Sequence, residues 1–160
     1  MIVKEALELI RGRINDEFDT GYTDERLINY LNDAVKYLSS AIIARHDPML
    51  TKELLVEATG TDVPFNFIRF AGGFPIKRIG NKFYIADSSK CVASKYFFMP
   101  SDLKDVEDEM PFNTHEVYNT VVVNLACLYA LNQHEFNISQ DSALKQQFDS
   151  LLTEALGAIE

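Results

Sequence analysis

The spacing of apolar residues changes twice along this chain of 160 residues, and that change constrains the fold more than any motif. Up to about residue 46, and again from about residue 114, apolar residues recur at helical intervals of three and four. Between about residues 54 and 99 the apolar runs are short and are separated by glycine, proline and aromatic residues, as in strands joined by turns. The pattern predicts the order helix, helix, β-insert, helix, helix.

Four helices are expected, over about residues 2–14, 23–46, 114–136 and 140–158. Thr23, Thr114 and Ser139 are the expected N-caps of the last three. Pro48 should end the second helix, because proline disfavours helical backbone in the residue before it. These elements predict a mainly α protein of the α+β class, a single domain of residues 1–160. Its four-helix bundle-like body would carry a small antiparallel β-insert between the second and third helices.

The β-insert is expected over about residues 54–99. Strands at Ile76–Ile79 and Lys82–Ile85 are separated by Gly80-Asn81, a two-residue spacing that is typical of a hairpin. A third strand is expected at Cys91–Phe98. The three strands together predict a small antiparallel meander.

Charge is distributed unevenly along the chain. Its 15 Lys and Arg against 24 Asp and Glu give a formal net charge of −9, which disfavours a generic basic nucleic-acid binder. Residues 63–100 nevertheless hold six basic residues and one acid, a net +5, together with nine of the 18 aromatics, so the rest carries −14. Complementary charges of this kind favour head-to-tail association. The alternative is that exposed lysines discourage pairing at strand edges while phenylalanines form a core.

The candidate interface cations are Arg69, Lys77, Arg78, Lys82, Lys90 and Lys95. Residues 101–109 follow this basic segment and contain five acids and one lysine with little apolar spacing. This run is expected to form a solvated linker or a short, frayed turn.

No catalytic, cofactor-binding or metal-binding residue is predicted. His46, His115 and His134 are far apart and lack the i, i+4 spacing of a metal-binding helix. The glycine-rich and serine motifs of nucleotide-binding proteins and hydrolases do not occur, and the abundant carboxylates single out no acid–base pair. The sequence therefore favours a protein that is not an enzyme and has no cofactor.

The sequence also predicts a soluble protein made in a reducing cytoplasm and not associated with a membrane. The most apolar segment, residues 121–131, is eleven residues long, whereas a spanning helix needs about 20. No signal peptide is readable at the start, and Cys91 and Cys127 form neither a disulfide framework nor a CxxC site.

Several strings, in this order, resemble the head-to-tail adaptor (connector) proteins of tailed bacteriophages. Residues 23–34, TDERLINYLNDA, are similar to the TDEELLRYLNDA opening of that family. Residues 63–67, VPFNF, lie where the family has an LPxDF turn, with Asn66 in place of the usual aspartate. Met110-Pro111-Phe112 before the third helix and residues 134–137, HEFN, before the fourth complete a resemblance that covers nearly the whole chain.

The resemblance implies a non-enzymatic structural protein of the virion neck, forming a ring, usually of twelve copies, below the portal protein. Such a ring extends the DNA channel and offers a docking surface to a downstream tail or nozzle protein, so double-stranded DNA passes close by. Acidic residues would flank this channel, where like charge keeps DNA from adhering. The candidates are Asp102, Asp105, Glu107, Asp108 and Glu109.

A second class of function stays open on the sequence. A small non-enzymatic helical interaction or regulatory module, acting as a monomer or dimer, is also compatible with these patterns. Its signature would be an exposed apolar groove between helices.

Overall fold

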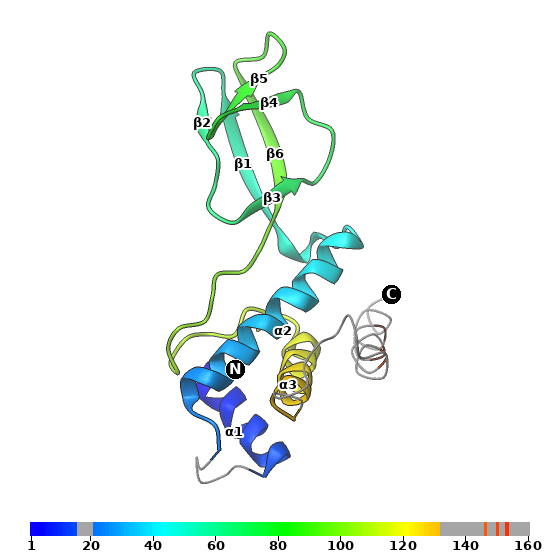
Figure 1. The fold of residues 1–160 in the computed structure, drawn as a ribbon. Coiled ribbons are helices and arrows are strands. Elements are labelled where there is room, and N and C mark those ends of the chain that lie inside the picture. The colour runs from blue at the N-terminus through cyan, green and yellow to red at the C-terminus, as the bar shows by residue number, and fades with distance from the viewer. Residues whose placement is uncertain (16–20, 132–145, 147–149, 151–152, 154–160) are drawn as a thin grey trace. The chain divides into compact units, whose positions relative to one another are not determined.

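A computed structural model of the chain describes residues 1–15, 21–131, 146, 150 and 153 (Figure 1). The helices are α1 (Val3–Ile14), α2 (Asp24–Ala44) and α3 (Glu116–Leu131), with a short 3₁₀-helix, η1 (Pro48–Leu50). The strands are β1 (Thr51–Glu57), β2 (Thr61–Asp62), β3 (Phe67–Phe70), β4 (Ile76–Ile79), β5 (Lys82–Ile85) and β6 (Cys91–Phe98).

The chain divides into two compact units, and the division falls within α2. The helical unit comprises Met1–Leu38 and Asp102–Glu160, and the β unit comprises Ser39–Ser101. The β unit contains eight basic and five acidic residues, a net charge of +3, so the helical unit carries −12. The charge asymmetry of the sequence therefore coincides with a structural division.

The prediction of a four-helix bundle-like body with a small insert is wrong. The described residues form three α-helices and six strands in two antiparallel sheets. The physical reason is that the β residues bury a core of their own, so they form a compact unit and not an appendage of a bundle. The predicted fourth helix, at residues 140–158, lies outside the described residues apart from positions 146, 150 and 153, as do residues 132–136 of the predicted third helix.

The helices of the helical unit follow their predicted apolar stripes. Val3, Leu7 and Ile10 of α1 are buried, as the periodicity predicts, and α3 is buried over a wide arc. The rings of Tyr30 on α2 and Tyr129 on α3 stack with their centroids 6.3 Å apart. These contacts give the three helices a common core.

Both ends of α2 have identifiable caps. Thr23 is the N-cap as predicted, since its Oγ1 accepts a hydrogen bond from the backbone N–H of Arg26 at 3.2 Å. The helix ends at Ala44, two residues before the prediction, because His46 has a left-handed backbone with φ 59°. The N–H groups of His46 and Asp47 then close back on earlier carbonyls in a Schellman arrangement.

The predicted third helix begins at Glu116 and not at Thr114. The hydroxyl of Thr114 lies 3.2 Å from Nδ1 of His115. A turn closed by the backbone bond from His115 N–H to the carbonyl of Phe112 precedes the helix.

Two three-stranded sheets make up the β unit. In the first, of order β1-β6-β3, β1 and β6 pair over seven residues, from Thr51 opposite Phe97 to Glu57 opposite Cys91. In the second, of order β2-β5-β4, β4 and β5 form the predicted hairpin across Gly80-Asn81, which is confirmed with its predicted bounds. The positive φ of 62° at Gly80 suits glycine at this turn.

The predicted meander is wrong, although its third strand has the predicted bounds. β6 pairs with β1 and β3, and not with β5. The reason lies in the aromatic core. The ring centroid of Phe83 on β5, which is 1% exposed, lies 5.0 Å from that of Phe67 and 4.8 Å from that of Phe70, both on β3, so these rings join the two sheets. Two sheets joined by such a core bury more apolar surface than one exposed meander.

Arg11 offers a test of the helical unit, because it is a buried cation with defined partners. It is 9% exposed, and its guanidinium donates to Oδ1 of Asp24 at 2.7 Å and to the carbonyl of Tyr22 at 2.9 Å. Arg11→Ala leaves both acceptors short of a donor, so we expect the free energy of unfolding to fall by about 1–2 kcal/mol. Urea unfolding measures this change. Lys4→Ala, at an exposed position of the same helix, is the control, and an equal loss in both variants would contradict the role of Arg11.

Candidate assembly surfaces

Arg69 contributes to the structure of the β unit. It lies on β3, and its guanidinium donates to the carbonyl of Ile43 at 2.8 Å. The same group lies 3.4 Å from Nδ1 of His46 and 5.2 Å from the ring centroid of Phe97. Because the carbonyls at a helix C-terminus carry partial negative charge, a cation placed there stabilises the end of α2.

Two of the three candidate cations in the β4–β5 hairpin also have partners within the β unit. Nε of Arg78 donates to the carbonyl of Gly80 at 3.0 Å, and Nζ of Lys82 lies 3.4 Å from Oδ1 of Asp62. Lys77, on β4, is exposed. Lys82 thus shares its charge with a carboxylate, whereas the bond from Arg78 to a neutral carbonyl leaves the charge of Arg78 in place.

Lys90 and Lys95 complete the candidate cations. Lys90 is exposed in the bend before β6, and Lys95 lies on β6 directly opposite Glu53. The six residues are thus spread over both sheets and the bend between them. Three of them, Arg69, Arg78 and Lys82, contact groups of the same unit.

The acidic segment Asp102–Glu109, here named the acidic strap, is held against the start of α1. The carbonyls of Val106 and Asp108 accept from the N–H groups of Lys4 at 2.8 Å and Val3 at 2.9 Å. The first turn of α1 has no side-chain cap, so the strap satisfies donors that a helix start leaves open. The segment is an ordered part of the helical unit and not a frayed turn.

Asn32 of α2 ties the strap to the helical unit, and sequence reasoning missed it. Its Oδ1 accepts from the N–H of Leu103 at 2.7 Å, and its Nδ2 donates to the carbonyl of the same residue at 2.9 Å. The pair of bonds holds Leu103 in a buried position. The sequence signal for this contact is the position of Asn32 inside a helix, where asparagine is disfavoured because it is a poor helix former.

The acidic side chains of the strap differ in their surroundings. Asp108 holds the turn together: its Oδ2 accepts from the backbone N–H groups of Lys104 at 2.8 Å and Asp105 at 2.9 Å. These bonds, that from Lys104 first, lower the pKa of Asp108 below its ordinary value.

The other four candidate acids, Asp102, Asp105, Glu107 and Glu109, are exposed. Asp102 lies 3.4 Å from Nζ of Lys36, and Glu109 accepts from the side-chain amide of Asn113. The structure thus places these four carboxylates at the surface on a backbone that is held by hydrogen bonds.

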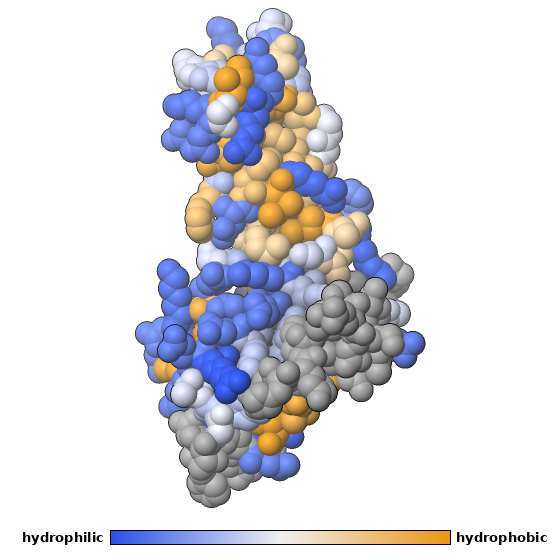
Figure 2. Space-filling view, viewed as in Figure 1, coloured by the Kyte–Doolittle hydropathy of each residue, from blue (hydrophilic) through white to orange (hydrophobic). Residues whose placement is uncertain are grey.

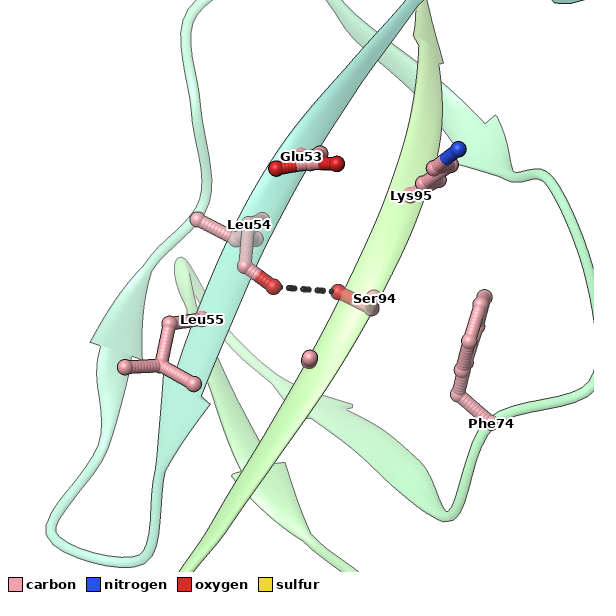
Figure 3. Close-up of a pocket in the computed structure, with 7 residues that line it drawn as sticks. Glu53, Leu54, Leu55, Phe74, Ser94 and Lys95 are labelled. Atoms are coloured by element: carbon pink, nitrogen blue, oxygen red, sulfur yellow. Dashed lines mark hydrogen bonds between the residues drawn. The ribbon is translucent and has the colours of Figure 1, made fainter.

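A hollow of about 390 Å³ lies on β1 and β6 beside Phe74, and sequence reasoning missed it as well (Figure 3). Its lining residues are Glu53, Leu54, Leu55, Phe74, Ala93, Ser94 and Lys95. Ser94 is buried and donates its hydroxyl to the carbonyl of Leu54 at 2.8 Å. Most of the lining is apolar, while Glu53 and Lys95 face each other across the two strands.

Phe65 is a further surface feature that the charge count did not single out. Its side chain is 87% exposed, and Ile68 on the adjoining β3 is 45% exposed. Figure 2 shows apolar residues gathered over β3 on the visible face of the β unit. An exposed apolar patch of this kind is characteristic of a contact surface.

Within the residues that the structure describes, no group of three or more His, Cys, Asp or Glu could hold a metal ion. His46 and His115 belong to different units, and His134 is not among the described residues. None of the described helices is long and apolar enough to cross a membrane.

No protein-family model matches the chain, and neither does any curated protein.

The attachment of the strap can be tested at Asn32. Asn32→Asp keeps an acceptor for the N–H of Leu103 but removes the donor to its carbonyl and places a charge there. We expect a loss of about 1–3 kcal/mol in unfolding free energy and faster amide hydrogen exchange at Leu103. Asn29→Ala, exposed on the same helix, should change neither quantity. Unaltered exchange at Leu103 in the Asn32→Asp variant would contradict the attachment.

The carboxylate of Asp108 leads us to expect that the stability contributed by the strap depends on pH. Its pKa is lower in the folded protein than its ordinary value, so the folded state binds fewer protons than the unfolded state. The stabilisation is therefore complete above the ordinary aspartate pKa of about 3.9 and is lost as pH falls through the lower folded-state value. We expect wild type to lose its advantage over Asp108→Asn on acidification, as measured by urea unfolding across this pH range.

The control for this titration is Glu107→Gln, which removes an exposed carboxylate from the same strap. The difference in unfolding free energy between this variant and wild type should vary less with pH. If the difference in unfolding free energy between wild type and Asp108→Asn stays constant with pH, the stabilising role of the Asp108 carboxylate is contradicted.

Proposed function

We propose that this chain is a structural, non-enzymatic subunit of a tailed-bacteriophage neck. It forms a head-to-tail adaptor ring, usually of twelve copies, that docks below the portal protein. The ring extends the DNA channel and offers a surface to a downstream tail or nozzle protein. The ordered sequence strings that resemble adaptor proteins motivate this proposal.

The observation that carries the proposal is the division of charge between the two units. The β unit has a net charge of +3 and the helical unit −12. A subunit with one basic and one acidic part is complementary to a second copy of itself, which favours head-to-tail contacts. Such contacts close into a ring when the rotation between subunits permits.

The acidic strap supports a place beside the DNA channel. Asp102, Asp105, Glu107 and Glu109 are exposed, and backbone hydrogen bonds fix the segment that carries them. A wall of negative charge repels the phosphate backbone, so DNA can pass without adhering. The subunit would be soluble in the bacterial cytoplasm before it joins the virion.

Light scattering of the purified full chain, alone and with its cognate portal protein, tests this proposal. We expect large assemblies with the portal that weaken as salt is raised from about 0.1 M to 1 M, because screening shortens the Debye length from about 10 Å to 3 Å. Persistent monomer in every mixture, with no binding to the portal, would contradict the proposed function.

A further inference from the structure

The β4–β5 hairpin has one face toward the aromatic core and one face away from it. Side chains alternate between the two faces of a strand, and residues opposite each other on paired strands share a face. Phe83, which is 1% exposed, marks the core face. Ile79 lies on the other face, with Lys82 opposite it and Lys77 two residues earlier on the same strand. An apolar side chain thus stands between two lysines.

Ile79 is held out to solvent on an ordered turn. Its side chain is 60% exposed, and the turn that follows it is closed by the positive φ of Gly80 and by the bond from Nε of Arg78 to the Gly80 carbonyl. A β-branched side chain on such a backbone has little conformational freedom to lose when a partner buries it. A single exposed isoleucine needs no partner by itself, so the charges beside it decide.

Most of the positive charge of the hairpin is not neutralised within one copy. Residues 76–85 contain three basic residues and no acid, and Lys82 pairs with Asp62 of β2, so three cations against one acid leave +2. Among the residues that the structure describes, no carboxylate forms an ion pair with Lys77 or Arg78. These two charges remain available to a partner.

Three other cations of the β unit have contacts within it. Arg69 donates to a carbonyl at the end of α2, and Nζ of Lys52 lies 4.3 Å from the ring centroid of Phe98. Lys95 lies directly opposite Glu53. The hairpin therefore combines unpaired positive charge with an exposed apolar side chain.

These properties specify the chemistry of the partner. It must offer carboxylates to the two cations and an apolar contact to Ile79. The helical unit of a second copy, with a net charge of −12, attracts the hairpin, whereas a second β unit, at +3, repels it. The helical unit also exposes apolar side chains near acids: Leu9 on α1 is 42% exposed, and Glu5, one turn earlier, is exposed as well.

We propose that the β4–β5 hairpin of one copy docks on the acidic helical unit of a second copy. Ile79 is buried at the contact, and Lys77 and Arg78 lie beside carboxylates of the other copy. Because the two surfaces differ, the contact is head-to-tail and can continue from copy to copy. This inference rests on the proposed self-association and names the element that forms its basic half.

Two variants of the full chain test the charge and the apolar side chain separately. Both Lys77→Glu and Ile79→Ser are at exposed positions, so thermal unfolding should match wild type. In sedimentation velocity at about 0.1 M salt, where the Debye length is about 10 Å, we expect each variant to self-associate roughly 10-fold more weakly than wild type.

Lys90→Glu is the matched control for charge. Lys90 is exposed in the bend before β6, and its replacement changes the net charge of the chain as much as Lys77→Glu does. It acts on association only through the long-range field, so it should weaken association less than Lys77→Glu.

Cross-linking identifies the unit that the hairpin meets. A carbodiimide joins a lysine amine to a carboxylate in direct contact, and a mixture of ¹⁵N-labelled and unlabelled chains separates links between copies from links within one copy. We expect Lys77 of one copy to be joined to an acid of Met1–Leu38 or Asp102–Glu160 of the other.

The other outcomes overturn the inference. Equal weakening by Lys77→Glu and Lys90→Glu shows that net charge alone acts, and wild-type association by Ile79→Ser shows that the apolar side chain is not buried. Links between copies that join Lys77 to the β unit exclude the helical unit as its partner. Wild type that stays monomeric alone but assembles with the portal overturns this contact and keeps the proposed function. Wild type that does neither overturns both.

Discussion

The pairing of β1 with β6 is the constraint on which the β unit depends. The two strands lie at opposite ends of this unit in the sequence, yet they pair over seven residues, from Thr51 opposite Phe97 to Glu57 opposite Cys91. The residues between them leave the β1–β6 pair and return to it. The pairing brings β3 onto the other side of β6 and so places Phe67 and Phe70 against Phe83. The aromatic core, the Phe65 turn and the hollow all follow from that arrangement.

The structure changes the meaning of the charge pattern. A count along the sequence treats every lysine and arginine as equally available to a partner. In the β unit, Arg69 instead stabilises the end of α2, and Lys82 pairs with Asp62. The net charge of each unit still favours association over long distances, because it depends on the sum and not on single pairs. The net charge does not by itself orient a contact, because orientation depends on the fit of the two surfaces.

The acidic strap combines a structural and a surface role within the helical unit. One short segment closes the open start of α1 with its backbone, fixes itself to α2 through Asn32, and leaves most of its carboxylates exposed. Because backbone groups make the structural contacts, the side chains remain available for a surface role. Asp108 is the exception, since its carboxylate holds the turn.

The sequence by itself determined the elements whose signals are local: the apolar stripes of α1 to α3, the Thr23 cap and the β4–β5 hairpin. The periodicity of side chains and the chemistry of turns act over a few residues, so they can be read directly. Only the tertiary structure decided that six strands form two sheets, that Arg69 meets the end of α2, and that Asn32 holds the strap. These outcomes depend on contacts between residues far apart in sequence, where burial of a shared core selects among pairings that local propensity leaves equal.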